Sequence, residues 1–227
     1  MATAIVPVKR FGAAKQRLLG VLDRPQRAAL AKAMLADVLS ALERSTLVDT
    51  VIVVTGEGRA ERLALARGRE GLLLEVLRDP DDAGHSQAAT LGVVRAVALG
   101  AECAALLPGD CPLLDPAELD EVLDGMAQGR AVVVPDRHGS GTNALILAPP
   151  DAIAPAFGEG SRARHVERAA RRGLDVLVSQ LSSLALDVDE PDDLSDLSRI
   201  LEQDPDAAPA TAAEVARISA RISGIRR

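Results

Sequence analysis

Aromatic side chains are the scarcest feature of this 227-residue chain, which contains Phe11 and Phe157 but neither tyrosine nor tryptophan. A surface for single-stranded nucleic acid stacks bases on aromatic rings and surrounds them with positive charge. Here the formal net charge is −7, which also opposes binding to a phosphate backbone. The sequence therefore argues against a nucleic-acid partner, and both phenylalanines lie in Gly-containing, charged segments that do not resemble core.

Cysteine, histidine and long apolar runs are also scarce. Cys103 and Cys111 match neither a metal-binding nor a redox spacing, and the three histidines are too dispersed to suggest zinc. No apolar run approaches the roughly 20 residues that a membrane helix needs. The N-terminal residues lack the apolar core of a signal peptide. We therefore expect a cytoplasmic protein with no membrane partner.

Two phosphate-binding signatures are missing after the first predicted strand. The loop contains neither G-x-G-x-x-G nor G-x-x-x-x-G-K-[ST], which disfavours dinucleotide oxidoreductases and P-loop enzymes. It does contain Lys9, Arg10, Gly12 and Lys15, in a chain with only one other lysine, Lys32. Such a cationic loop suits a triphosphate, whose charge must be neutralised during substitution at phosphorus. The alternative is an ordinary solvated basic loop.

The hydrophobic pattern predicts strands that alternate with helices. Several strands lack polar alternation, as expected when helices cover both faces of a sheet. Alternating elements of this kind imply βαβ units and a mainly parallel sheet. The predicted strands cover residues 2–8, 51–55, 72–77, 104–107, 131–136, 142–147, about 175–179 and 184–189. We therefore predict one α/β domain with a Rossmann-like, mainly parallel central sheet and helices on both faces.

Three aspartates follow or end predicted strands. Asp110 comes after the strand at 104–107, where it either binds a divalent cation or closes the turn. Asp187 and Asp189 occupy positions i and i+2 of the strand at 184–189, which directs both to one face about 6 to 7 Å apart. A buried carboxylate without a partner is costly. The three acids are therefore candidates to hold one or two Mg²⁺ ions.

Two Gly-rich turns carry hydroxyl side chains: PDRHGSGTNAL at 135–145 and FGEGSRARH at 157–165. In the second turn, Ser161 opens a predicted helix whose free amides would bind a phosphate. Ser161 as a plain N-cap is the alternative, and the two roles are compatible.

Five motifs together resemble the phosphoenolpyruvate or 2-phospho-L-lactate guanylyltransferases of coenzyme F-420 biosynthesis. They are VPVKRFGAAKQRL, LPGDCPLL, PDRHGSGTNAL, FGEGSRARH and LALDVDEPDDL, and they cover most of residues 4–197. LPGDCPLL alone is typical of nucleotidyltransferases with a GT-A-like sheet, whereas TNAL with FGEGS is more specific. The resemblance implies a nucleotidyltransferase domain at 1–203, followed by a linker and short helical tail at 204–227.

The resemblance also implies roles for individual residues. Lys15 and Asp110 would be catalytic, and Mg²⁺ would be bound by Asp110, Asp187 and Asp189. GTP would contact Pro7, Val8, Lys9, Lys15, Gly84, Gln87 and Gly109. The phosphorylated acid would contact Thr142, Asn143, Gly158 and Ser161. An oxygen of the acceptor phosphate would attack the α-phosphorus of GTP, and pyrophosphate would leave.

Several alternatives stay open at this point. The sequence reads Gly84-His85-Ser86-Gln87 where relatives often read Gly-Leu-Asn, which leaves the choice of guanine open. The choice between phosphoenolpyruvate and 2-phospholactate, and a homodimer, are equally open. Another GT-A-like nucleotidyltransferase, acting on a molybdenum cofactor or a sugar phosphate, is a second enzyme hypothesis. A nucleotide-sensing module without chemistry is the non-enzyme hypothesis.

Overall fold

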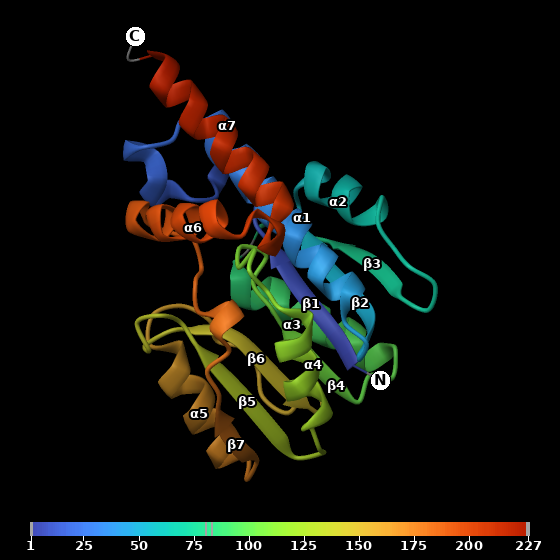
Figure 1. The fold of residues 1–227 in the computed structure, drawn as a ribbon. Coiled ribbons are helices and arrows are strands. Elements are labelled where there is room, and N and C mark those ends of the chain that lie inside the picture. Colours follow the sequence, from blue (N-terminus) through green and yellow to red (C-terminus); the bar gives the residue numbers. More distant parts are fainter. Residues whose placement is uncertain (1, 80, 83, 226–227) are drawn as a thin grey trace.

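A computed structural model describes residues 2–79, 81–82 and 84–225, with side chains described to residue 220. Its sheet has seven strands in the order β3-β2-β1-β4-β6-β5-β7 (Figure 1). The strands are β1 (Ala2–Val8), β2 (Val48–Thr55), β3 (Leu73–Arg78), β4 (Cys103–Leu106), β5 (Arg130–Pro135), β6 (Thr142–Ala148) and β7 (Asp175–Val178). Only β6 runs antiparallel to its neighbours, among the strands described. The prediction of a mainly parallel α/β sheet is confirmed.

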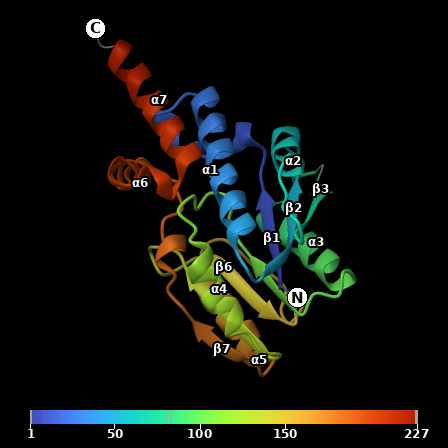
Figure 2. The same cartoon turned by 45° about the vertical axis from the view of Figure 1, so that its right-hand side comes forward.

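Helices cover both faces of this sheet, as predicted (Figure 2). They are α1 (Arg24–Arg44), α2 (Gly58–Leu65), α3 (His85–Ala98), α4 (Pro116–Asp124), α5 (Ser161–Arg171), α6 (Pro191–Gln203) and α7 (Pro209–Ile225). One apolar cluster contains residues of α1, α2, α4, α6 and α7, and the other contains residues of α3 and α5. Along β1, Val6 joins the first cluster and Ile5 the second, because successive strand residues point to opposite faces.

The direction of β6 determines what gathers at one edge of the sheet. The parallel strands β1, β2 and β4 end at this edge, whereas the antiparallel β6 begins there. Residues after β4 and the first residue of β6, Thr142, therefore lie close together. Gly109, in the turn after β4, allows close packing, because a Cβ there would lie 3.4 Å from the side chains of both Leu35 and Val8.

The predicted strand at 184–189 is wrong. A short 3₁₀ turn occupies Ser182–Leu184, and an irregular segment runs on to α6. Leu184 and Val188 are fully buried, and the carbonyl of Leu184 accepts a hydrogen bond from the side-chain amide of Asn143 at 2.7 Å. Core packing and the hydrogen bond from Asn143 therefore hold this segment in place. A strand would instead need a neighbouring strand to bond its backbone groups.

Phe11 was expected outside the core, and this expectation is also wrong. Its side chain is 1% exposed and belongs to the larger apolar cluster. The Arg59 guanidinium lies 5.3 Å from the centre of its ring, within cation–π range. The 3₁₀ turn Phe11–Ala13 brings this ring inward from a polar loop.

The C-terminal helix α7 packs along α1 (Figures 1 and 2). The buried carboxylate of Asp37, in α1, accepts the backbone N–H groups of Ala210 and Thr211 at 3.1 and 2.7 Å. Ile218 is buried in the larger cluster. The residues after 203 thus include a long docked helix, while the division into a domain at 1–203 and a tail stays a prediction. Within the described residues, no helix is long and apolar enough to cross a membrane.

Candidate active site

A cavity of about 500 Å³ opens at the edge of the sheet where β1 and β4 end and β6 begins. It brings together all but two of the residues predicted to form the site. These are Pro7, Val8, Lys9, Lys15, Gly109, Asp110, Thr142, Asn143, Gly158, Ser161, Asp187 and Asp189. The other two, Gly84 and Gln87, are not among its lining residues. His85, which lies between them in sequence, does line the cavity.

Two parts of the cavity differ in chemistry. We call the part lined by Lys15, Asp110, Asp187 and Asp189 the charged half, and the part lined by Thr142 and Ser161 the hydroxyl half. The volume of the whole cavity lies within the range of small-molecule sites, about 300 to 1,000 Å³.

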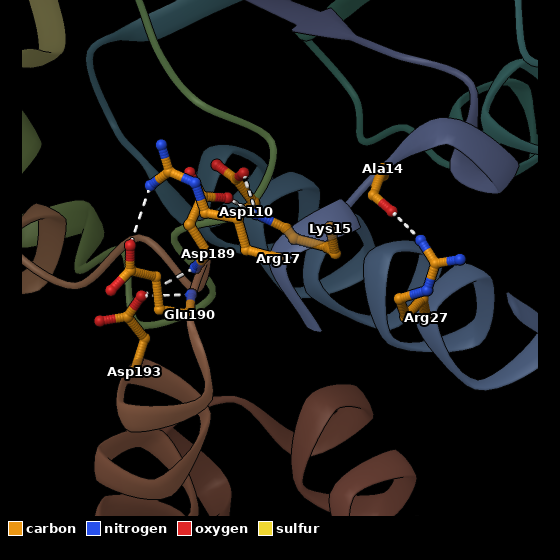
Figure 3. Close-up of polar contacts among 8 residues, drawn as sticks. All are labelled: Ala14, Lys15, Arg17, Arg27, Asp110, Asp189, Glu190 and Asp193. Carbon is orange, nitrogen blue, oxygen red and sulfur yellow. Dashed lines mark hydrogen bonds and ion pairs between the residues drawn. The ribbon is translucent and has the colours of Figure 1, made fainter. Parts of the chain in front are cut away.

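Lys15 is the centre of the charged half (Figure 3). Its side chain is 4% exposed, and its ammonium group forms ion pairs with Asp110 and, at 2.9 Å, with Asp189. Burial alone would lower the pKa of Lys15, but the negative charges and hydrogen bonds of the two aspartates raise it above its ordinary value. Lys15 is therefore a fixed positive charge facing the cavity.

Asp187 also lines the cavity. Burial raises the pKa of its carboxyl group, and the neighbouring charges of Asp110 and Asp189 raise it further. In the described part of the chain, no group of three acidic, histidine or cysteine side chains has the arrangement of a metal site. The three acids share one cavity although the predicted strand is absent.

Asp193 positions Asp189, and the sequence analysis did not identify it. Its carboxylate, in the first turn of α6, accepts the backbone N–H groups of Asp189 and Glu190 at 3.0 and 2.6 Å (Figure 3). Arg137 forms an ion pair with the same carboxylate. An acid three residues after Glu190 at a helix start is a capping-box pattern, and it could have indicated this contact. No sequence signal points to Arg137.

Arg27 holds the loop that carries Lys15 (Figure 3). This buried α1 side chain donates from Nη1 to the carbonyl of Ala14 at 2.9 Å. Lys15 itself adopts the left-handed conformation, with φ 57° and ψ 42°, which is costly for a residue with a Cβ. The contact beside it restrains this conformation. Arg27 is a second residue that the sequence analysis missed.

Ser161 occupies the hydroxyl half, and its hydroxyl group has no hydrogen-bond partner within the described chain although it is fully buried. The N-cap hypothesis for this residue is wrong, because the N-cap of α5 is Gly160. The amides of α5 are also less free than expected. The N–H of Ser161 donates to Gly158 at 3.0 Å and that of Arg162 to Ser140 at 3.2 Å.

Thr142 and Asn143, the first residues of β6, have different contacts. The hydroxyl oxygen of Thr142 lies 3.0 Å from Nδ1 of His165 in α5. Asn143 is mostly buried and donates to the Leu184 carbonyl, so it ties β6 to the segment that leads to Asp187. His165 is a third residue that the sequence analysis missed, because it had been considered only as a zinc ligand.

Several solved structures share this fold. A nucleotidyl transferase from Methanothermobacter thermautotrophicus aligns with a TM-score of 0.62 at 21% identity, over 89% of this chain and 98% of its own. A protein from Desulfovibrio desulfuricans described as a nucleotide-diphospho-sugar transferase aligns with a TM-score of 0.75 at 19% identity, over 98% and 97% of the two chains. At these identities the likeness establishes the fold alone.

Sequence relatives identify the family of this chain. The model of the family described as "Guanylyl transferase CofC like" matches residues 2–203. The phosphoenolpyruvate guanylyltransferase of Conexibacter woesei is 48% identical over 87% of each chain. The 2-phospho-L-lactate guanylyltransferase of Methanothermobacter thermautotrophicus is 36% identical over 86% of this chain and 82% of its own. This chain belongs to the family of CofC-like guanylyl transferases, which confirms the resemblance inferred from its motifs.

Proposed function

We propose that this enzyme transfers GMP from GTP to the phosphate of phosphoenolpyruvate or 2-phospho-L-lactate, a step in the biosynthesis of coenzyme F-420. One observation carries the proposal: the Thr142 hydroxyl and a buried Ser161 hydroxyl, which has no hydrogen-bond partner among the described residues, share a cavity with the buried Lys15 ammonium. A buried hydroxyl without a partner costs free energy. A phosphate oxygen bound there would supply the missing hydrogen bond.

In this mechanism the two halves hold different reactants. The triphosphate of GTP lies over the charged half, where Lys15 offsets the negative charge that develops at the α-phosphorus. The acceptor phosphate lies in the hydroxyl half, against Thr142 and Ser161. One of its oxygens forms a bond to the α-phosphorus. The bond from that phosphorus to the oxygen bridging to the β-phosphorus breaks, and pyrophosphate leaves.

The chemistry of the three acids suits the proposed Mg²⁺ ion, although the described chain does not arrange them as a metal site. Asp110, Asp187 and Asp189 offer carboxylate oxygens, the ligands that this hard cation prefers. Burial, followed by the charges of Asp110 and Asp189, raises the pKa of the Asp187 carboxyl group. A bound cation would favour its charged form. When bound, the ion would neutralise phosphate charge and so favour substitution at phosphorus.

The relatives support phosphoenolpyruvate as the first acceptor to test. Those named for it include enzymes of Conexibacter woesei at 48% and Rubrobacter xylanophilus at 40% identity. One relative, from Phenylobacterium zucineum at 38% identity, is named a 3-phospho-D-glycerate guanylyltransferase, so this acid belongs in the same test. The cytoplasmic location and a homodimer stay predictions.

A turnover screen tests the proposal directly. GTP, ATP, CTP and UTP are each combined with the three phosphorylated acids and with a sugar phosphate in the presence of Mg²⁺, and pyrophosphate is measured. We expect release with GTP and phosphoenolpyruvate or 2-phospholactate, and a product mass equal to GMP plus the acceptor minus water. Release only with the sugar phosphate would make the protein another nucleotidyltransferase. No release with any pair would support the nucleotide-sensing hypothesis.

A further inference from the structure

His165 lies beneath the hydroxyl half of the cavity and contacts it only through other residues. Its ring is fully buried in α5 and is not among the groups that line the cavity. The backbone N–H of Ala156 donates to Nε2 at 2.8 Å, and the Thr142 hydroxyl lies 3.0 Å from Nδ1. The ring of Phe157, a cavity residue, meets the imidazole edge to face at 5.2 Å.

These contacts determine which nitrogen of His165 carries the proton. A backbone N–H can only donate, so Nε2 must be the unprotonated nitrogen that accepts from Ala156. In the neutral ring the proton then belongs to Nδ1. Burial, followed by the charges of Arg168 and Arg164, lowers the pKa of His165 to about 4, so the ring is neutral near pH 7. Nδ1–H therefore donates to the oxygen of Thr142.

This bond leaves the Thr142 hydroxyl with a proton to donate. Among the residues that the structure describes, no protein acceptor is bonded to that hydroxyl group, and Thr142 lines the cavity. An acceptor-only group in the cavity, such as a phosphate or carboxylate oxygen, would complete the pattern. Without His165 the hydroxyl group could turn and donate into the protein.

We propose that His165 is a positioning residue that orients the Thr142 hydroxyl as a hydrogen-bond donor to an oxyanion of the phosphorylated acid. The proposal rests on the proposed function, because the bound acid is the substrate named there. Three hydrogen bonds follow one another: from the Ala156 N–H to the imidazole, from the imidazole to Thr142, and from Thr142 to the ligand. Each bond determines which group donates in the next. Chains of this kind strengthen their members.

Kinetics with paired variants test the role. His165→Gln can keep an acceptor for the Ala156 amide near the Nε2 position but loses the donor to Thr142. His165→Asn places an amide donor near Nδ1 instead. We expect His165→Gln to raise the acceptor KM about fivefold, the effect of one ordinary hydrogen bond, with the GTP KM unchanged. His165→Asn should have an acceptor KM close to that of wild type, and the exposed His138→Gln should match wild type.

A double-mutant cycle separates positioning from general damage. In a Thr142→Ala background, His165→Gln should raise the acceptor KM no further, because the residue through which it acts is gone. Equal fivefold effects in both backgrounds, or equal rises in the KM of GTP, would overturn the proposal.

A spectroscopic measurement keeps this inference distinct from the proposed function. Nitrogen-15 NMR of the wild-type rings, only three in the chain, should show one neutral histidine protonated at Nδ1 at pH 7, with its signal missing in His165→Gln. If the signal that is lost in His165→Gln comes from a ring protonated at Nε2, or from a charged ring, the inference is overturned even if the enzyme turns over. If no phosphorylated acid reacts while this tautomer is observed, the proposed function fails and the hydrogen-bond chain stands.

Discussion

The charged half of the cavity is held by ion pairs, whereas the hydroxyl half is held by neutral hydrogen bonds. In the charged half, Lys15 joins Asp110 to Asp189 (Figure 3). In the hydroxyl half, the contacts of Thr142 and His165 involve no net charge. Burial lowers the pKa of both side chains, and the two aspartates outweigh it for Lys15, so the lysine stays protonated. His165 has no carboxylate to oppose burial among the groups that shift its pKa, so its ring is neutral.

This difference suits the two proposed reactants, a triphosphate and an acceptor phosphate, because they require different contacts. A triphosphate requires fixed charge where bonds to phosphorus change. The acceptor must be held in place while one of its oxygens stays free to attack. Neutral donors can bind it without withdrawing as much charge from that oxygen as a cation would. The comparison therefore predicts large rate effects from the charged half and smaller binding effects from the hydroxyl half.

The largest effect is expected from the acids of the charged half. Asp110→Asn and Asp187→Asn should each lower kcat roughly a thousandfold, because they remove charge from the proposed metal site without changing volume. Exposed Asp206→Asn is the matched control and should keep the wild-type rate. Initial rates with saturating GTP and Mg²⁺ measure kcat of the variants and of the control, and melting temperatures show whether each protein is folded. Activity within a few-fold of wild type in both variants would contradict the metal assignment.

Acid should destabilise the hydroxyl half through His165. Its pKa is about 4 in the folded protein against an ordinary 6.5, so between these values the unfolded chain binds a proton that the folded chain does not. The contribution to stability is complete above pH 6.5 and is lost as the pH falls towards 4. It amounts to at most about 3 kcal/mol.

Denaturant unfolding from pH 7 to pH 4 measures this loss. His165→Gln should show a shallower fall in the free energy of unfolding over this range than wild type, and exposed His138→Gln should not. Parallel curves for wild type and His165→Gln would show that the imidazole has the same pKa in the folded and unfolded states.

Removing a hydroxyl from the hydroxyl half should affect one substrate only. Thr142→Ala and Ser161→Ala should each raise the acceptor KM about tenfold to a hundredfold, the loss expected for a charge-assisted hydrogen bond. The GTP KM should barely change. Separate titrations of each substrate distinguish the halves. A rise confined to GTP would mean that their assignments are reversed.

The smallest effect is expected from Arg27, which supports the charged half from behind. Arg27→Lys keeps the charge but loses the guanidinium that holds the Ala14 carbonyl. Loosening the Lys15 loop should raise the GTP KM about fivefold, in keeping with one hydrogen bond, with the acceptor KM unchanged. Arg44→Lys, an exposed change at the last residue of α1, is the control. Equal changes in both KM values would show that Arg27 serves the fold rather than this loop.

Local patterns determined the framework of this protein. Apolar strands without polar alternation, spaced by helices, predicted a mainly parallel sheet covered on both faces. The motifs around Asp110, Thr142 and Ser161, through the family that they resemble, named residues that line one cavity, while their roles stay predictions. The prediction of the sheet succeeded because strand periodicity depends on neighbours in sequence.

Only the tertiary structure decided how the site is held together. The segment carrying Asp187 and Asp189 reads as a strand but is irregular, because its apolar residues fill the core and Asn143 binds its backbone. Arg27 and His165 act on partners that they meet only after folding. Phe11 is buried because a polar loop folds over the core. Contacts between segments distant in sequence leave no periodic signal, so no local pattern could have shown them.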